Sequence, residues 1–486
     1  MEPLRVLNTS QMEQIDQAAR SILERTGIRI DSTEALDYLR RFGCHTDEAA
    51  RLVKIPSRLS YDVIDKMRRD YRKPDRPERM SVRYSHVRFR PSPYEVHSDF
   101  TVSTGGFCCF LNDLDGCRRP AGRDDVLCSI NMVNHLDGID YTGLPVSDQT
   151  VPAEHRPVVM AAELAKWTRK LGGVETFSAA DARWIHEIGQ VVASSAEEYR
   201  RHPVLVGYAE TRSPLCFDHN MVGVFLEYVK LGVPQTVDTM AAGGTTAPVT
   251  AAGILALATA ETLAAVVLGY AVREDAVLAM DIVPSYGDMH TGMFKYSGGD
   301  RCNLLMARVQ LLAEYYGCPT GVHGGKTDGC FYNEQVGAEK MSSMLLPVLA
   351  GAVGIGTVGH LENAVTFSPV QLVIDNEMTH YVRRSLRTPW IVDDETLAAD
   401  LIHSVGPGGN YLSESHTAKH FREELYLTPL FSVRPWAEAH RKPQEYDQTQ
   451  RARQIAVDIW RRPEKPVLDD DQIREIDRIV HRATHN

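Results

Sequence analysis

The sequence predicts an α/β fold: a closed parallel (β/α)8 barrel of the TIM-barrel type, with a helical extension before it and a helical tail after it. Three observations support this prediction. Eight short β runs alternate with helical stretches, and a barrel of this type requires eight strand-then-helix units. The connections are short enough for right-handed crossovers. No Gly-x-Gly-x-x-Gly turn follows the first strand, which argues against the alternative of a doubly wound open sheet.

The first 98 residues are expected to form a separate helical extension with a short hairpin. The sequence Ser10-Gln-Met-Glu13 is a capping box that predicts a helix ending at Gly27. A second helix is expected over 32–42, where apolar residues fall on one stripe. Alternating residues over 81–90 predict the hairpin.

The barrel itself is expected over 99–387, and the C-terminal extension, packed on it, over 388–486. Each strand is a short apolar run. Strands are expected at 101–105, 139–146, 171–177, 204–208, 235–240, 277–283, 320–323 and 355–359. The helices between them carry apolar residues at three- and four-residue spacing. They are expected at 123–136, 154–169, 180–192, 218–231, 248–272, 301–316, 334–350 and 368–385, with a further helix at 471–482 in the tail.

The composition excludes several classes of protein. Lys and Arg total 53 against 64 Asp and Glu, a formal net charge of −11, and such a field repels phosphate polymers, so nucleic-acid binding is not expected. Nine cysteines without a Cys-x-x-Cys pair are too few for a disulfide scaffold of this size and predict reduced thiols. The opening Met1-Glu2-Pro3 lacks the pattern of a secretory signal. Together these features predict a cytoplasmic protein.

One segment has the length of a transmembrane helix. Residues 247–272 are nearly all apolar, and about 20 such residues span a bilayer. The segment is rich in Ala, Gly and Thr, however, and Glu261 lies in its middle. A charge at the bilayer centre costs roughly 3 kcal/mol, which weakly apolar residues do not offset. A helix buried inside a large protein is therefore the preferred interpretation, and no membrane association is expected.

In a barrel of this type the functional groups come from the loops that follow the strands. Those loops carry aromatic, acidic and basic residues, among them Phe107, Phe177, Tyr208, Glu210, Arg212, Tyr286, Phe294, Tyr296, His323, Lys326, Asp328, Phe331, Tyr332, His360, Glu362 and Phe367. Aromatic faces with scattered carboxylates at one mouth indicate a pocket for a small cation, because ring faces attract cations by about 0.5–2 kcal/mol per contact. The alternative for each ring is simple packing between loops.

Metal and nucleophile chemistry have weaker support. The best metal-ligand set would be His323, Cys330 and His360, but no close pair in sequence supports it, and no tightly bound metal is expected. His416 and His420 fall in the tail and indicate a polar surface. A Gly-x-Ser-x-Gly elbow is absent from the sequence. The run 243–246 could cradle a phosphate, but it lacks the Lys of a phosphate-binding loop and is better explained as a turn before a helix.

Three segments resemble a known family. They are 243–268 (GGTTAPVTAAGILALATAETLAAVVL), the C-terminal GPGGNYL at 406–412 followed by His416-Thr417 and Phe421-Arg422, and Gly324-Gly325 with Asp328 and the stretch 335–339. Together they resemble the trimethylamine methyltransferase (MttB-type) superfamily over nearly the whole chain. The resemblance implies a barrel enzyme that moves a methyl group from a methylated amine to the cobalt of a separate corrinoid protein.

One departure from the family pattern bears on the substrate. Members acting on trimethylamine carry pyrrolysine in the loop after the seventh strand, whereas the corresponding loop, near Gly329-Cys330, holds standard residues. The sequence therefore resembles the non-pyrrolysine branch, which includes glycine betaine:corrinoid methyltransferases. A quaternary amine releases a neutral tertiary amine when it loses a methyl group, so it needs no further activation. The enzyme's contribution is then positioning and the exclusion of water.

A pocket with two ends is expected for such a substrate. Phe367 and Tyr208, followed by Phe331 and Tyr296, are the candidates for an aromatic cage around the trimethylammonium head. His360, followed by Lys326 and Arg212, is the candidate donor to the substrate carboxylate. The alternative for His360 is a bridge between backbone groups of the last two loops.

The remaining expectations concern cofactor and partners. No cobalamin-binding Asp-x-His-x-x-Gly motif occurs in the sequence, so the corrinoid is expected on another protein, docked over the carboxyl face of the barrel. Self-association into a homo-oligomer is also expected. Two other functions stay open: a quaternary-amine-binding protein without catalysis, and a metal-dependent lyase or hydrolase on the same barrel.

Overall fold

The structure is a computed structural model that describes residues 1–71, 94–96, 98–106, 108–387, 390–431, 433, 435–462 and 464–485. The hairpin predicted at 81–90 and the candidate loop residue Phe107 lie outside the described residues. So does the boundary predicted at 387/388, where residues 388 and 389 are not described.

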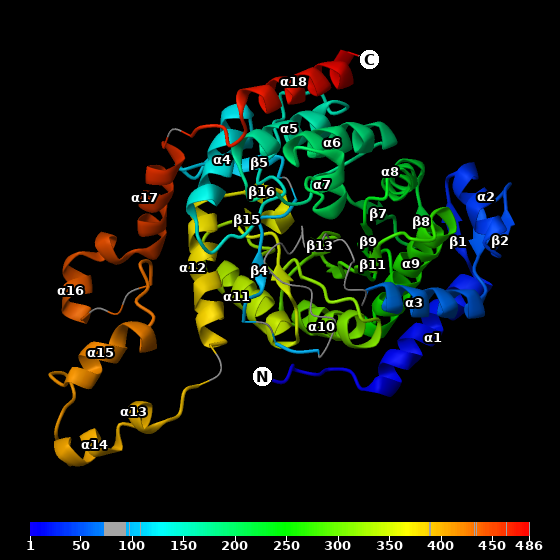
Figure 1. The fold of residues 1–486 in the computed structure, drawn as a ribbon. Helices are drawn as coiled ribbons and strands as arrows, with labels where there is room; N and C mark the ends of the chain where they lie inside the picture. The colour runs from blue at the N-terminus through cyan, green and yellow to red at the C-terminus, as the bar shows by residue number, and fades with distance from the viewer. Residues whose placement is uncertain are drawn as a thin grey trace.

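Short parallel strands form the centre of the molecule, with helices around them (Figure 1). These strands are β4 (Thr101–Val102), β7 (Ala209–Thr211), β9 (Gln235–Thr239), β11 (Leu278–Met280) and β14 (Gly354–Ile355). The pairs β7–β9, β9–β11 and β14–β4 are parallel. The α/β class predicted from the sequence is confirmed.

Single parallel bridges extend this pairing between consecutive segments. They join Ser103 to Tyr141, Thr142 to Leu171, Val174 to Gly207, and Val322 to Ile355. Among the described residues no backbone pairing joins β11 to the segment around Val322. There the Asp281 carboxylate accepts a hydrogen bond from Thr320 Oγ1 at 3.1 Å. Closure into a complete ring, as predicted, is therefore not confirmed by the pairing.

The helices predicted between the strands are present with nearly the expected bounds. They are α4 (Arg123–His135), α5 (Arg156–Trp167), α6 (Ala179–Val192), α8 (His219–Lys230), α9 (Ala251–Val272), α10 (Gly299–Gln310), α11 (Glu334–Leu349) and α12 (Pro369–Ser385). A short α7 (Ala196–Arg201) was not predicted, and α10 continues into a π-helical turn over Leu311–Tyr315. Large apolar side chains from helices and strands form two buried clusters that hold this arrangement together.

The N-terminal extension contains strands as well as helices. It consists of α1 (Thr9–Arg25), β1 (Ile28–Ile30), α2 (Thr33–Arg41), β2 (His45–Asp47), β3 (Leu52–Lys54) and α3 (Ser57–Tyr71). The capping box of α1 is formed by Asn8 and Gln11, so the prediction of Ser10 and Glu13 was wrong by two residues. The side chain of Asn8 accepts from the Gln11 backbone at 2.9 Å, which satisfies a free N–H at the helix start.

Helix α9 corresponds to the apolar segment at 247–272 that has the length of a transmembrane helix. Among the described residues it is the one helix long and apolar enough to cross a membrane, and most of it is buried inside the protein. Helices α1, α2, α3 and α8 pack around it. The Glu261 carboxylate, fully buried, accepts hydrogen bonds from Thr211 Oγ1 at 2.9 Å, Ser213 Oγ at 2.7 Å and the Leu215 backbone at 2.7 Å. Because these hydrogen bonds satisfy the buried Glu261 carboxylate, the structure agrees with a helix in the core of the protein.

Additional hairpins, not predicted from the sequence, lie beside the ends of the central strands. One sheet has the order β15 (His360–Leu361), β16 (Thr366–Phe367), β5 (Phe110–Asn112) and β6 (Arg118–Pro120). A second has the order β10 (Ala242–Gly243), β12 (Ser285–Gly287) and β13 (Phe294–Lys295). A short β8 (Cys216–Phe217) pairs with β1 and joins the N-terminal extension to the loop after β7.

The C-terminal part is helical, as predicted. It contains α13 (Asp394–Leu397), α14 (Ala399–Val405), α15 (Ser415–Glu424), α16 (Trp436–Arg441), α17 (Gln448–Trp460) and α18 (Asp470–His485). Helix α17 packs on α12 and α4, and α18 packs on α5 and α6. The predicted tail helix corresponds to α18.

Candidate active site

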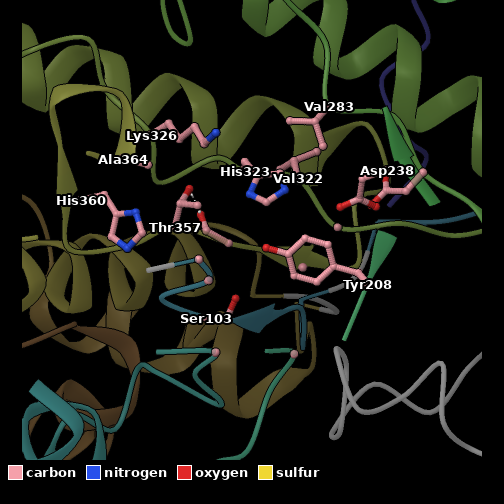
Figure 2. A pocket seen from close by; sticks show the side chains of 18 of the residues that line it. Ser103, Tyr208, Asp238, Val283, Val322, His323, Lys326, Thr357, His360 and Ala364 are labelled. Atoms are coloured by element: carbon pink, nitrogen blue, oxygen red, sulfur yellow. Dashed lines mark hydrogen bonds between the residues drawn. The ribbon is translucent and has the colours of Figure 1, made fainter. Parts of the chain in front are cut away.

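A cavity of about 330 Å³ lies at the ends of the central strands. Figure 2 shows the side chains that line it. The lining combines acidic, basic and aromatic residues with backbone positions from several strands. Its chemically active members are Glu175, Glu210, Asp238, Asp281, His323, Lys326, His360, Tyr141 and Tyr208. The volume suits a small metabolite and is far too small for a corrinoid.

Glycines provide the room for this cavity. Gly105, Gly143, Gly173 and Gly356 are among the lining residues. A Cβ at Gly143 would lie 2.6 Å from the Gly173 carbonyl oxygen, so any side chain there would displace the neighbouring strand. The central strands therefore approach one another closely at the cavity floor because they carry no side chains at these points.

Four carboxyl groups line the cavity. They belong to Glu175, Glu210, Asp238 and Asp281. Asp281 is already ion-paired with the buried Arg308 guanidinium. Burial, with the nearby Glu210, raises the pKa of Glu175 well above its usual range, although the Tyr208 hydroxyl 3.5 Å away opposes this shift. The protonated form of Glu175 is therefore favoured.

A basic part lies away from Asp238, as Figure 2 shows for Lys326 and His360. The ammonium of Lys326 lies 4.1 Å from the centroid of the Tyr296 ring. Burial, with the nearby Arg301, lowers the pKa of Lys326 to about 8. The lysine is thus charged at neutral pH, but it titrates within the range that enzyme assays cover.

His360 is fully buried and borders the same cavity. Among the described residues, neither of its ring nitrogens has a hydrogen-bond partner. Burial, with Lys340 and Lys326 nearby, lowers the pKa of His360 well below its usual range, so the ring is neutral. A buried polar side chain without a partner costs stability, and a ligand in the cavity would satisfy it.

A buried ion pair between Lys340 and Asp375 stabilises the backbone next to Lys326 and His360. The ammonium of Lys340 donates to the Gly325 carbonyl at 2.5 Å and to the Asp375 carboxylate at 2.7 Å. The same carboxylate accepts from the Gly359 backbone at 2.6 Å. Gly325 and Gly359 immediately precede Lys326 and His360, so the pair fixes the backbone positions of both cavity residues.

The structure brings together three of the seven residues predicted for the site. Tyr208, Lys326 and His360 line the cavity. Tyr296 is buried against Lys326 and does not line it.

The other three predicted residues lie elsewhere. Phe367 is buried in the core, with its ring perpendicular to His360 at 6.5 Å. Phe331 points into solvent at 74% exposure. The guanidinium of Arg212 lies 3.5 Å from the Cys216 sulfur, outside the cavity.

Sequence reasoning missed several lining residues, above all Tyr141, Glu175, Asp238 and Asp281. Asp238 lies within β9, and Asp281 directly follows β11. An acidic residue inside a buried strand is itself a signal, because a buried carboxylate is costly unless it has a role or a partner.

The candidate metal-ligand set of His323, Cys330 and His360 is not assembled. His323 and His360 both line the cavity, but Cys330 is exposed and does not. Over the described residues, no group of three or more His, Cys, Asp or Glu side chains is arranged to hold a metal ion.

Comparison with known proteins gives consistent matches over all or most of the chain. The sequence matches the model of a family described as trimethylamine methyltransferase (MTTB) over residues 1–486. A trimethylamine methyltransferase MttB from Methanosarcina barkeri is 26% identical, covering 99% of this chain and 95% of the relative. A glycine betaine methyltransferase from Desulfitobacterium hafniense is 26% identical, covering 88% of this chain and 87% of the relative.

A solved structure is also similar. The crystal structure of the monomethylamine methyltransferase MtmB from Methanosarcina barkeri aligns with a TM-score of 0.45 at 12% identity, over 93% of this chain and 88% of the other.

Proposed function

The chain belongs to the trimethylamine methyltransferase family, and from this premise we propose that it removes a methyl group from a quaternary amine, glycine betaine first of all, and passes it to the Co(I) of a corrinoid carried by a separate protein. Membership of the family supports methyl transfer from a methylamine-type substrate. We propose the quaternary substrate and the corrinoid partner in addition. We also propose that the central strands close into a (β/α)8 barrel, that the domain limits lie at 98/99 and 387/388, and that the protein is cytoplasmic.

The observation that carries the proposal is the separation of charge in the cavity. Asp238 lies in one, acidic part, and Lys326 with His360 lies in another. Glycine betaine is a zwitterion with a trimethylammonium head and a carboxylate tail. Its head matches the acidic part, where Tyr208 offers a ring face. Its carboxylate matches Lys326 and the unpartnered His360, through charge-assisted hydrogen bonds.

The proposed reaction requires little chemical assistance from the side chains of this protein. In-line displacement forms a cobalt–carbon bond and breaks the carbon–nitrogen bond, whose electron pair leaves with a neutral tertiary amine. No proton has to be supplied. The residues of this chain hold one methyl group toward the cavity mouth, which contributes through orientation. The partly apolar surroundings also disfavour the charged ground state relative to the transition state.

The corrinoid partner is expected to approach over the cavity mouth. The loops after the central strands expose large apolar side chains, namely Phe177, Val249, Met289, Met293, Phe294 and Val365. Exposed apolar groups gathered around a mouth are typical of a protein-docking surface. Because the cavity holds only a small molecule, the macrocycle has to stay with its carrier and meet the methyl group at this rim.

Replacing Tyr208 tests the aromatic contact with the ammonium head. We expect Tyr208→Ala to raise the KM for glycine betaine about tenfold, because one cation–π contact contributes on the order of 1–2 kcal/mol in a desolvated site. Tyr208→Phe keeps the ring and is expected to change the KM by less than about threefold. Steady-state kinetics of both variants provides the measurement, and equal losses would assign the role to the hydroxyl instead.

The proposed function itself is tested with free cob(I)alamin and a panel of methylated amines. We expect the corrinoid spectrum to change to that of methylcobalamin with quaternary amines, and with glycine betaine above the rest. Binding of quaternary amines without any methylcobalamin would favour a non-catalytic binding protein. Activity that a chelator abolishes and a divalent ion restores would favour a metal-dependent lyase or hydrolase. Either result would overturn the methyl-transfer proposal.

A further inference from the structure

The C-terminal part contains a folded segment without a core of its own. We call residues 390–441 the arm, which contains α13, α14, α15 and α16. Over 390–429 no described residue is buried, although the segment includes three helices. In Figure 1 the arm extends away from the body beside α12 and returns through α17. Only from Leu430 onward does the chain regain a buried residue.

Few bonds hold the arm to the body. The Tyr426 hydroxyl lies 2.8 Å from the Glu377 carboxylate, and the guanidinium of Arg384 contacts the Glu423 carbonyl. Within the arm, Glu395 of α13 accepts from Lys419 at 2.6 Å and from His420 of α15 at 3.0 Å. Except for the part-buried bond from Tyr426 to Glu377, these contacts are exposed, and exposed ion pairs contribute little to stability.

Helices of this length do not persist without a surface to pack on. Helix α14 has 7 residues and α15 has 10, whereas isolated helices shorter than about 12–15 residues are marginal in water. Most helical stability in proteins comes from the burial of an apolar face. The arm therefore requires a surface that the described part of its own chain does not provide.

The arm carries the apolar side chains that such a surface would cover. Half of the large hydrophobic side chains that the described residues expose lie between 390 and 436, a small part of the chain. The most exposed are Trp390, Ile391, Val392, Leu412, Leu427, Val433 and Trp436. Because each large aromatic buries roughly 150–250 Å² at a contact, the arm offers on the order of 1,000 Å² of apolar surface.

We propose that the arm is an interface through which the chain associates with a second copy of itself. A symmetric exchange doubles the area that one arm offers, which reaches the size of an obligate homodimer interface. Such interfaces are large and apolar, whereas a carrier protein that must leave after each turnover forms a smaller and more polar one.

The position of the arm also separates it from the cavity mouth. Helix α12 begins beside the cavity, where the Ser368 backbone donates to the Gly359 carbonyl at 2.9 Å. Near its other end, Arg383 donates to the Phe100 carbonyl, just before the first central strand, at 3.2 Å. At 1.5 Å per residue this 17-residue helix spans about 25 Å. The arm therefore starts on the face opposite to the mouth, where it leaves the corrinoid partner free access.

The oligomeric state of the full chain tests this proposal. We expect light scattering after gel filtration to give a mass near twice the 54.2 kDa of one chain, or a higher multiple. The combined variant Trp390→Ser, Leu412→Asp and Leu427→Asp is expected to give the mass of one chain. Tyr61→Asp changes an exposed aromatic residue of α3, outside the arm, and is expected to leave the mass unchanged.

Hydrogen exchange of the unmodified chain gives a second readout that does not depend on the folding of a variant. Amides of α14 and α15 are expected to be protected at micromolar concentration and to lose that protection on dilution. A monomeric wild-type chain, or an arm variant that keeps the oligomer, would overturn the proposal. Protection that arises only on addition of a corrinoid protein would also overturn it and would assign the arm to that partner.

Discussion

Replacing Lys326 with methionine is expected to raise the KM for glycine betaine on the order of 100-fold, because a charge-assisted hydrogen bond inside a buried cavity contributes about 1.5–3 kcal/mol. The ammonium of Lys326 borders the cavity together with His360. Tetramethylammonium has the same cationic head but no carboxylate, so its affinity is expected to stay unchanged or to improve when the lysine charge is removed. Kinetics and binding with both compounds provide the measurement.

The matched control is Lys295→Met. Lys295 lies in the neighbouring β13 and is not among the residues that line the cavity. We expect this variant to keep the KM for glycine betaine within about threefold, since Lys295 is partly exposed and does not line the cavity. If Lys326→Met weakened glycine betaine and tetramethylammonium equally, Lys326 would not be the partner of the carboxylate.

The same residue predicts a pH dependence. Burial and Arg301 lower the pKa of Lys326 to about 8. The charged form, which binds the carboxylate, predominates below this pH and is lost above it. The KM for glycine betaine is therefore expected to be flat below pH 8 and to rise up to about tenfold per pH unit above it. In Lys326→Met the rise should disappear, whereas a rise that persisted would point to another titrating group.

The helices were the part of the fold that the sequence predicted best. Periodic apolar residues and capping residues are local signals, and they placed α6 and α11 within one residue of their actual bounds. The π-helical turn at Leu311–Tyr315 has no such signal, and it was included in the helix predicted at 301–316. The true cap of α1, Asn8, lies two residues before the predicted one because both positions offer an acceptable capping pattern.

The residues of the site were predicted only in part, because the sequence does not show how the short strands pair. Tyr208, Lys326 and His360 were predicted correctly from their positions at or after the ends of predicted strands. Phe367 also satisfies that rule, but β16 pairs antiparallel with β15, and this contact places the ring in the core. Such pairing joins residues through space and leaves no local pattern. Asp238 was missed because only loops were searched, although it lies inside β9.

Breaking the buried pair of Lys340 and Asp375 is expected to have the largest effect on stability. Both side chains are fully buried, and removing one partner leaves the other charge buried and unpaired. Lys340→Met and Asp375→Leu are each expected to cost about 3–5 kcal/mol, seen as a lower urea midpoint. The double variant Lys340→Met with Asp375→Leu is expected to recover much of this loss, because an apolar pair of similar volume packs without the desolvation penalty.

Stability and substrate binding should separate in that double variant. Its core is repaired, but the bonds from Lys340 to the Gly325 carbonyl and from Asp375 to the Gly359 backbone are gone. Lys326 and His360 then lose their backbone supports, so the KM for glycine betaine is expected to stay raised by about tenfold or more. Lys442→Met removes an exposed pair with Glu445 and should change stability by less than about 1 kcal/mol. Single variants that lose no more stability than this control would show that the buried pair does not stabilise the fold. An unchanged KM in the double variant would show that it does not support the basic end of the cavity.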